Sequence, residues 1–274
     1  MLNPEELQRV YQRAYVPEHL PNYVAAIAGA EAHLLENRLC YTRQSHLIFI
    51  GYPLKGDPQD NPFAYEAACK QFQPSTVAII APEIWALKET AEAQPADVYY
   101  RLKLPAGSLA PGVAYMLRRA ERELSVHTGR FGKEHRKLIK AFIDGHDLSE
   151  QQKNIFKNIK RYQKNSSTSR LLEARKRGRL AAFTIVDLGS ADSAYYMFNF
   201  RSSEVPIPGA SDLLLREMVS LARAEGKKAL NLGLGINTGI RRFKEKWGGA
   251  PFLPYAAAMV HRGTADFDRL AKKL

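Results

Sequence analysis

Residues 169 to 260 carry the pattern that most restricts the fold. SRLLEARK and RLAAFTIVDL are β-type runs joined by a tight turn at Arg177-Gly178, and SAYYMFNFRS is a third β-type run. The segment 210–226 has apolar residues at helical spacing and a glycine at its end. The runs KKALNLGLG, TGIRRFKEKWGG and FLPYAAAMV follow. We therefore predict the order β-β-β-α-β-α-β, with the strand after the first helix placed beside SAYYMFNFRS through a helical crossover.

In the third run, alternation predicts that Tyr196, Phe198 and Phe200 share one face, opposite Tyr195, Met197, Asn199 and Arg201.

The N-terminal half repeats this order in a weaker form. Residues 33–52 predict a hairpin, 53–62 a loop rich in Pro, Gly, Asp and Asn, 63–72 a helix and 75–82 a strand. Such an internal echo indicates tandem copies of one unit. Between the copies we expect helices at 113–124, 133–143 and 149–163, the last with a capping box at its start.

These patterns predict an α/β (α+β) protein with two similar domains, each a mixed, mostly antiparallel sheet flanked by helices. We place an N-terminal domain at 1–125, a basic helical connector at 126–168 and a C-terminal domain at 169–274. The more legible C-terminal domain is expected to carry the reaction site.

The net charge of +12 is concentrated in one stretch. Residues 118–179 contain 18 lysines and arginines against 7 aspartates and glutamates. A clustered basic band attracts RNA, anionic lipid head groups or a phosphorylated cofactor. Solvated helix faces in a basic protein would give the same composition, so both interpretations stay open.

Targeting and cysteine signals favour a cytoplasmic protein. No apolar run approaches the roughly 18 residues that span a bilayer, and MLNPEELQRVYQR lacks the pattern of a signal peptide. Cys40 and Cys69 have no metal-ligand spacing. We expect both to be buried thiols, and we expect no metal.

Pro208, Gly209, Ala210 and Ser211 precede or begin the first predicted helix of the C-terminal half. Free N–H groups at a helix start bind phosphate, and a glycine lets the backbone approach it. A plain turn with Ser211 or Asp212 as the N-cap residue is the alternative. The negative charge of Asp212 also argues against phosphate at this position.

Lys244 is the second candidate. In the predicted helix it lies on the edge of the apolar face formed by Ile240, Phe243 and Trp247. A partly buried ammonium can stabilise a tetrahedral oxyanion or a phosphate leaving group. Snorkelling, or an ion pair with Glu245 or a distant carboxylate, would explain the same position. Arg241, on the same helix, is included as a donor-binding candidate.

Polar residues also lie near the expected carboxyl ends of two neighbouring strands, where ligands bind in open α/β sheets. Asn199 and Asn231 are candidates to orient an amine or a carbonyl, together with Arg201 and Asn237. Tyr195 is a candidate acid. Glu173, Asp187 and Glu204 are candidate bases, although each residue type is more often found in packing or surface roles.

The segments LLEARKRGRLAAFTIVD, PGASDLLLREMVSLARAEGKKALNLGLG and GIRRFKEKWGG resemble the GNAT superfamily of N-acetyltransferase-like proteins. The Phe-Lys pair and Trp-Gly ending of the third segment are similar to Fem-type aminoacyltransferases and to the catalytic domain of phosphatidylglycerol lysyltransferases. IGYPLKGDPQDNPFAYEAACKQF resembles the first half of the latter domain. These relatives are double GNAT folds, and the resemblance covers 169–260 well and 33–85 loosely.

The resemblance implies direct attack of an amine or hydroxyl on a thioester or aminoacyl ester, without a metal. It matches Gly209, Ala210 and Ser211 to the donor-phosphate loop and Lys244 to the Fem-type lysine. The acetyl-CoA loop of the family, Arg/Gln-x-x-Gly-x-Gly/Ala, is kept here only at its end, in Val205-Pro206-Ile207-Pro208-Gly209-Ala210. This departure favours a larger donor, such as aminoacyl-tRNA or an acyl carrier, over acyl-CoA.

We therefore expect an acyltransferase or aminoacyltransferase that uses acyl-CoA, an acyl carrier or aminoacyl-tRNA. Its acceptor would be a small molecule, a peptide or a lipid, and residues 118–179 could contact tRNA. The rival expectation is a non-catalytic GNAT-fold protein that binds nucleic acid or anionic lipid through this basic band.

Overall fold

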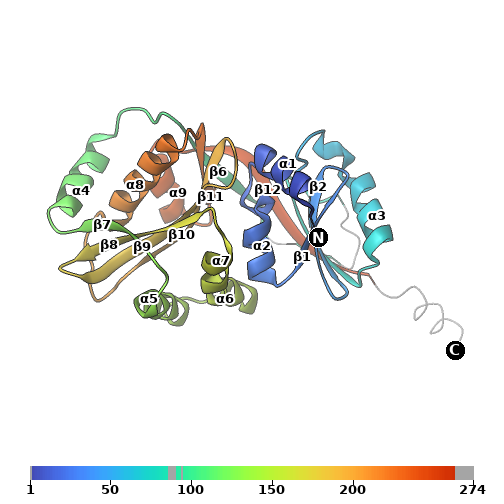
Figure 1. Ribbon diagram of the computed structural model, residues 1–274, viewed down its shortest axis with the longest axis horizontal. Coiled ribbons are helices and arrows are strands. Elements are labelled where there is room, and N and C mark those ends of the chain that lie inside the picture. Colours follow the sequence, from blue (N-terminus) through green and yellow to red (C-terminus); the bar gives the residue numbers. More distant parts are fainter. Residues whose placement is uncertain (1, 86–90, 94, 263–274) are drawn as a thin grey trace, which may run out of the picture.

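The computed structural model describes residues 2–85, 91–93 and 95–262. Its strands follow one path, β1-β2-β3-β4-β12-β6-β11-β10-β9-β8-β7, with β5 (Ala91–Ala93) paired to β12 off this path. The strand β12 (Ala250–His261) joins the two halves, because its start pairs with β6 (Asp97–Lys103) and its end with β4 (Thr76–Ala81). Figure 1 shows it running from one half of the molecule to the other.

The C-terminal half has the predicted order of elements. β8 (Ser169–Lys176), β9 (Arg179–Asp187) and β10 (Ser193–Arg201) form an antiparallel meander. Helix α8 (Ala210–Ala224) then crosses over to β11 (Ala229–Leu234), which is parallel to β10, and α9 (Thr238–Glu245) leads to β12. This confirms the crossover expected from the sequence.

The N-terminal half repeats the arrangement with one strand more than predicted. The expected hairpin at 33–52 consists of three strands, β1 (Glu31–Leu35), β2 (Arg38–Arg43) and β3 (His46–Ile50). The prediction missed a second turn, in which Gln44 has a positive φ of 52°. Helix α3 (Asn61–Phe72) connects β3 to the parallel strand β4. The unit β-β-β-α-β therefore occurs twice, which confirms the tandem fold.

The strands and helices between β5 and β8 pack with the C-terminal half. β6 pairs with β11, and β7 (Ser125–Gly129) pairs with β8. Helix α4 (Pro111–Glu121) lies beside α8, while α5 (Lys133–Asp144), α6 (Glu150–Lys157) and α7 (Ile159–Asn165) lie below the sheet in Figure 1. The helix predicted at 149–163 is thus two helices, separated at Asn158. The domain limits at 125 and 168 stay a prediction.

The N-terminal segment lies between the two halves. It contains α1 (Pro4–Arg13), the short 3-10 helix η1 (Pro17–His19) and α2 (Pro21–Ala28), whereas the second 3-10 helix, η2 (Pro58–Asp60), lies between β3 and α3. The carbonyl of Tyr15 accepts a hydrogen bond from Asn231 of the C-terminal half, at 2.9 Å. The carbonyl of Glu18 accepts one from Tyr41 of the N-terminal half, at 2.8 Å. The segment therefore holds the halves together.

A β-bulge in β10 overturns the predicted faces of this strand. The register against β9 shifts between Tyr196 and Phe198. Tyr196 therefore packs with the core under α8, whereas Phe198 and Phe200 pack on the opposite side of the sheet with α5, α6 and α7. The extra residue of a bulge moves the side chains beyond it to the opposite face of the sheet. A prediction that assumes uninterrupted alternation of side chains along the strand does not anticipate this change.

Gly209, the residue before α8, lies directly against α4. It has a φ of +82°, and a Cβ atom placed on it would lie 2.5 Å from the carbonyl oxygen of Met116 and 3.2 Å from Ala120. Both helices contribute to the same buried core, with Val113, Leu117, Leu213 and Leu214. A residue without a side chain is required here by conformation and by packing.

We predict that Gly209→Ala destabilises the protein by more than Gly178→Ala. Both glycines have positive φ, which costs an alanine roughly 1–2 kcal/mol. No atom lies within 4 Å of a Cβ on Gly178, so only the Gly209 variant adds an overpacking cost of about 1–3 kcal/mol. Urea unfolding of both variants measures the difference, and equal midpoints would contradict the close packing of α4 on α8.

Candidate functional site

The candidate site lies where the parallel strands β10 and β11 separate. Their pairing runs through Ser193–Ala229 and Ala194–Leu230 and ends at Tyr195–Asn231. Beyond this point β10 bends at its bulge, and Gly233 and Leu234 pair with β6 alone. We call the region around this separation, with Tyr100, Tyr196, Gly233, Leu234 and Lys244, the splay site. Its position is the sheet opening where the sequence predicted a ligand.

Lys244 points its ammonium group into the splay site. Helix α9 starts at a cap formed by Asn237, whose side chain accepts the Ile240 N–H at 2.9 Å. Two turns later, the Lys244 side chain donates a hydrogen bond to the carbonyl of Leu234. Its Nζ lies 5.7 Å from the centroid of the Tyr100 ring and would lie 3.8 Å from a Cβ on Gly233.

Burial makes this lysine unusual. Lys244 is 3% exposed, which is deeper than the helix-edge position that the sequence predicted. Loss of hydration lowers its pKa to about 7, although the negative charge of Asp97 acts in the opposite direction. The predicted alternative of an ion pair with Glu245 is not observed, because Lys244 takes part in none of the ion pairs among the described residues. The Glu245 carboxylate instead accepts a hydrogen bond from Tyr100 at 3.2 Å. Lys244 can therefore change its charge near neutral pH.

Asp97 and Arg241 form the outer edge of the site. The carboxylate of Asp97 accepts the Ile236 N–H at 2.7 Å and lies 3.6 Å from the guanidinium of Arg241. The Arg241 side chain is 46% exposed. The predicted donor-binding role of Arg241 stays a prediction, and its helix places it one turn before Lys244.

Asn199 and Ser211, which the sequence assigned to different roles, are in contact. The Asn199 amide nitrogen donates to Ser211 Oγ at 2.9 Å, and the buried Asn199 Oδ1 has no hydrogen-bond partner among the described residues. This contact links β10 beyond its bulge to the first turn of α8. An unsatisfied buried acceptor is costly, so it marks a position that a ligand donor could satisfy.

The start of α8 differs from both sequence interpretations. Its N-cap residue is Gly209, so neither Ser211 nor Asp212 has that role. Asp212 accepts a hydrogen bond from the Trp247 indole at 2.8 Å and pairs with Lys246 at 2.7 Å, which ties α8 to the end of α9. A Cβ atom on Gly209 would meet the carbonyl oxygen of Met116 in α4 at 2.5 Å.

The neighbours of Gly209 are also enclosed. Ala210 is 2% exposed and belongs to the core, and Pro208 is partly buried. The assignment of Pro208, Gly209, Ala210 and Ser211 to a donor phosphate stays a prediction. Gly209, the glycine that the loop 205–210 shares with the acetyl-CoA pattern, packs against α4, so a contact within the protein is enough to require a glycine here.

Asn231 and Tyr195 face the N-terminal segment and not Lys244. The Asn231 amide donates to the Tyr15 carbonyl at 2.9 Å and accepts the Gly233 N–H at 2.8 Å, so both of its polar atoms are used inside the protein. Tyr195 is fully buried, and burial raises its pKa. These contacts favour structural positions for both residues, although the predicted catalytic roles are not tested by them.

The three candidate bases lie in other environments. Glu173 contacts His135 at 3.0 Å and also pairs with Arg175. Asp187 accepts hydrogen bonds from Tyr162 and, at 2.8 Å, from Thr168. Glu204 pairs with Lys137 on the surface at 2.6 Å. Each carboxylate thus has a partner of its own outside the splay site.

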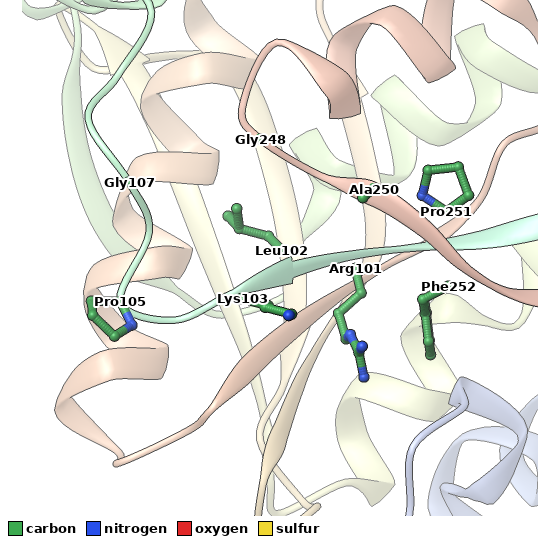
Figure 2. Close-up of a pocket in the computed structure, with 9 residues that line it drawn as sticks. All are labelled: Arg101, Leu102, Lys103, Pro105, Gly107, Gly248, Ala250, Pro251 and Phe252. Atoms are coloured by element: carbon green, nitrogen blue, oxygen red, sulfur yellow. The ribbon is translucent and has the colours of Figure 1, made fainter.

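A cavity of about 400 Å³ opens beside the splay site, at the end of β6 (Figure 2). The loop with Pro105 and Gly107 and the segment from Gly248 to Phe252 form its walls. Arg101 and Lys103 contribute positive charge, and the Arg101 guanidinium lies 4.7 Å from the centroid of the Phe252 ring. The cavity is suited to an anionic group with a flat apolar part.

Sequence reasoning missed Tyr100, Tyr196 and Asp97. They lie on strands without a motif, and their proximity to Lys244 depends on β6 entering the C-terminal sheet and on the bulge in β10. Burial and the charge of Asp212 raise the pKa of Tyr196. No local sequence signal distinguishes these residues from core residues.

Within the described residues, no group of three or more His, Cys, Asp or Glu side chains is arranged to hold a metal ion. Cys40 and Cys69 are buried free thiols, as predicted, and burial raises the pKa of Cys40 to about 12. Across the part of the chain that the structure describes, no helix has the length and apolar character of a membrane span.

We predict that Lys244→Met stabilises the protein most at low pH. The folded-state pKa of about 7 lies below the ordinary value of 10.5, so the cost of burying the charge is fully present below pH 7. As pH rises from 7 to 10, folded molecules release this proton first and the wild-type protein gains stability. The difference between variant and wild type, on the order of several kcal/mol at pH 6, should therefore shrink.

Urea unfolding between pH 6 and pH 10 measures this difference. Lys228→Met is the matched control, because its side chain is 75% exposed and should give a gap independent of pH in this range. A pH-independent gap for Lys244→Met would refute the buried, titrating lysine.

No protein-family model and no curated protein matches the sequence. Solved structures, however, match over nearly the whole chain. The C-terminal domain (DUF2156) of a proposed lysylphosphatidylglycerol synthetase from Agrobacterium fabrum aligns with a TM-score of 0.61 at 16% identity, covering 98% of this chain and 96% of that one. FemX aligns with a TM-score of 0.59 at 10% identity, covering 93% and 96%.

A tandem GNAT protein from the clavulanic acid biosynthesis pathway aligns with a TM-score of 0.50 at 14% identity, covering 84% of this chain and 79% of that one. At these identities the likeness concerns the fold. The protein therefore has the double-GNAT fold shared with FemX and the lysylphosphatidylglycerol synthetase domain, as its sequence resemblance indicated.

Proposed function

We propose that the protein is a GNAT-type transferase that moves an acyl or aminoacyl group from an activated carrier to an amine or hydroxyl. The observation that carries this proposal is Lys244, a lysine 3% exposed whose ammonium group lies where β10 and β11 separate. Burying a charge there costs stability without a structural ion pair in return. Such a cost is typical of residues kept for chemistry.

In the proposed reaction the acceptor nitrogen or oxygen attacks the carbonyl carbon of the donor ester or thioester. Lys244, as the ammonium, stabilises the negative oxygen of the tetrahedral intermediate. The carbonyl then re-forms as the bond to the carrier oxygen or sulfur breaks, and the proton that the acceptor loses ends on the departing carrier hydroxyl or thiol. Asn199, whose buried Oδ1 lacks a hydrogen-bond partner among the described residues, is proposed to orient the reacting groups from the start of α8.

For the donor, we favour aminoacyl-tRNA or an acyl carrier over acyl-CoA. Gly209 is in contact with α4, and the preceding loop lacks most of the acetyl-CoA pattern. The cations Arg101 and Lys103 at the adjacent cavity suit a phosphorylated carrier. The basic band at 118–179 suits tRNA. The structural neighbours of this chain include FemX and a lysylphosphatidylglycerol synthetase domain, and this shared fold supports an aminoacyl donor by analogy.

The acceptor is proposed as a small molecule, a peptide or a lipid bearing an amine or hydroxyl. A cytoplasmic location is part of the same proposal, because aminoacyl-tRNA and acyl-CoA are found there.

A second candidate is a non-catalytic protein that binds nucleic acid or anionic lipid through the basic band. The contact of Gly209 with α4 favours this rival, because it leaves less room for a donor phosphate beside this glycine.

We expect Lys244→Ala to lower kcat by about 10²–10³-fold, the usual effect of losing one donor to an oxyanion. The wild-type rate should fall as pH rises above about 7, because the ammonium form is then lost. This fall should be absent from the residual activity of Lys244→Ala. Lys244→Arg, which stays charged, should be active without the fall. The measurement is initial rate against pH with the donor identified below.

Lys228→Ala is the control, because this lysine is exposed just before β11, and the variant should keep wild-type kcat. Full turnover by Lys244→Ala would rule out the proposed role. A rate that rises through pH 7 would assign Lys244 as a base, contrary to its proposed role as a charged donor.

To identify the donor, we would measure melting temperature with acetyl-CoA, longer acyl-CoAs, free CoA and bulk aminoacyl-tRNA at low and moderate salt. Stabilisation that requires the aminoacyl group of the tRNA is expected. A response to CoA esters would correct the donor. Binding of RNA that ignores its aminoacyl group and weakens steeply with salt would favour the non-catalytic rival.

A further inference from the structure

The cavity at the end of β6 lies outside the splay site, on an open edge of the C-terminal sheet. The first residues of β12, 250–255, pair with β6 on one side, and no described strand pairs with their other side. Arg101 and Lys103 project from the face of β6 opposite to Tyr100 and the splay site, and both are exposed. The cavity is therefore a second place for a ligand, reached from solvent at this edge.

The positive charge of this cavity has no counter-charge in the described part of the chain. Nine residues line the cavity, and none of them is an aspartate or a glutamate. Arg101 and Lys103 also take part in none of the ion pairs that the described residues form. The two cations are two residues apart on one face of the strand, roughly 7 Å along it. A phosphate group suits them, because arginine binds phosphate with two N–H groups and lysine binds it as a point charge.

A flat surface lies next to these charges. The Arg101 guanidinium lies over the Phe252 ring, 4.7 Å from its centroid, and the centroid of the Tyr99 ring lies 6.4 Å from that of Phe252. Figure 2 shows the Arg101 and Phe252 side chains side by side at the cavity. A guanidinium that is stacked on one ring presents its second face to another flat group, and nucleobases stack on such surfaces. The cavity thus combines a phosphate-binding pair with a stacking surface.

The walls of the cavity leave room for a ligand of this kind. Its volume of about 400 Å³ lies in the range of roughly 300–1,000 Å³ that is typical of small-molecule sites. Gly107, Gly248 and Ala250 contribute backbone to the walls in place of large side chains. No atom lies within 4 Å of a Cβ placed on Gly107, so free space begins at this wall.

We propose that this cavity binds a nucleoside phosphate, with its base stacked on Arg101 and its phosphate bound by Lys103. The phosphate supplies the missing negative charge, and the base supplies a flat partner for the guanidinium. A phosphopantetheine arm has no base and would leave the flat surface unused. The assignment of this nucleotide to the donor rests on the proposed transferase function. The carrier is then one that contains an adenosine nucleotide, a tRNA or coenzyme A, in place of an acyl carrier protein.

The test is titration of the intact protein with adenosine 5′-monophosphate, followed by ligand-observed NMR at pH 7 and constant ionic strength. Adenosine, which lacks the phosphate, and glycerol 3-phosphate, which lacks the base, are the matched control compounds. We expect saturable binding of the nucleotide, with each control compound binding about tenfold more weakly or less. Equal affinities for the nucleotide and glycerol 3-phosphate would overturn the stacked base, and a lack of saturation by the nucleotide would overturn the site.

Arg101→Lys separates the two contacts, because it keeps the charge and removes the flat guanidinium. This variant should lose about tenfold in affinity for the nucleotide and keep the wild-type affinity for glycerol 3-phosphate. Lys103→Gln should weaken the binding of both compounds by about tenfold. Lys70→Gln, which removes an exposed lysine of α3, is the matched control and should bind the nucleotide as the wild type does. Unchanged nucleotide binding by both Arg101→Lys and Lys103→Gln would contradict the proposal.

Gly107→Phe fills the cavity without changing its charge, because a side chain at this position starts in free space. It should abolish saturation by the nucleotide. Gly112→Phe makes the same change in α4, where a Cβ also has no atom within 4 Å, and should leave nucleotide binding intact. Equal nucleotide binding by the two variants would place the ligand outside this cavity.

Two further probes distinguish the source of the nucleotide. Preference for the trinucleotide CpCpA, the 3′ end of tRNA, would assign the site to an RNA carrier. Preference for adenosine 3′,5′-bisphosphate, the nucleotide of coenzyme A, would assign it to a CoA ester.

These titrations need no turnover, so they are separable from the test of the proposed function. An absence of nucleotide binding together with a large Lys244→Ala effect would leave the transferase standing without this site. Nucleotide binding together with a fully active Lys244→Ala variant would keep the site and rule out the catalytic role of the lysine.

Discussion

The separation of β10 from β11 is the constraint on which the candidate site depends. Two parallel strands share hydrogen bonds only through Tyr195–Asn231, and a bulge then turns β10 away. Backbone groups beyond this point need other partners. Leu234 finds one in Lys244, and Gly233 finds one in the side chain of Asn231. The lysine thus fills a position that sheet pairing leaves open, which explains how its ammonium group can be buried and still donate a hydrogen bond.

Electrostatics around this opening differ on the two faces of β6. On the α9 face, the buried Lys244 has a pKa lowered to about 7. On the face of the N-terminal segment, the buried Glu18 has a raised pKa. Each group is destabilised in its charged form by burial, and neither forms an ion pair among the described residues.

Sequence reasoning recovered the fold well where periodicity was clean. The hairpin of β8 and β9, the crossover through α8 and the start of α9 all follow from local patterns. The prediction failed at two irregular positions: it missed the second turn near Gln44, and it missed the bulge after Tyr196 that reverses the faces of β10. For the site, Lys244 was found from its helix, but Tyr100 was not. The position of Tyr100 beside α9 depends on contacts such as its hydrogen bond to Glu245 across 145 residue positions, which no local pattern encodes.

The single strand β12 has a mechanical consequence. Since its first half belongs to the C-terminal sheet and its second half to the N-terminal sheet, the two halves cannot hinge freely without breaking strand pairs. Cutting the chain into separate halves would also expose the unpaired edge of β4 or β6, which is a template for aggregation. The shared strand therefore joins the two copies of the motif into one continuous sheet.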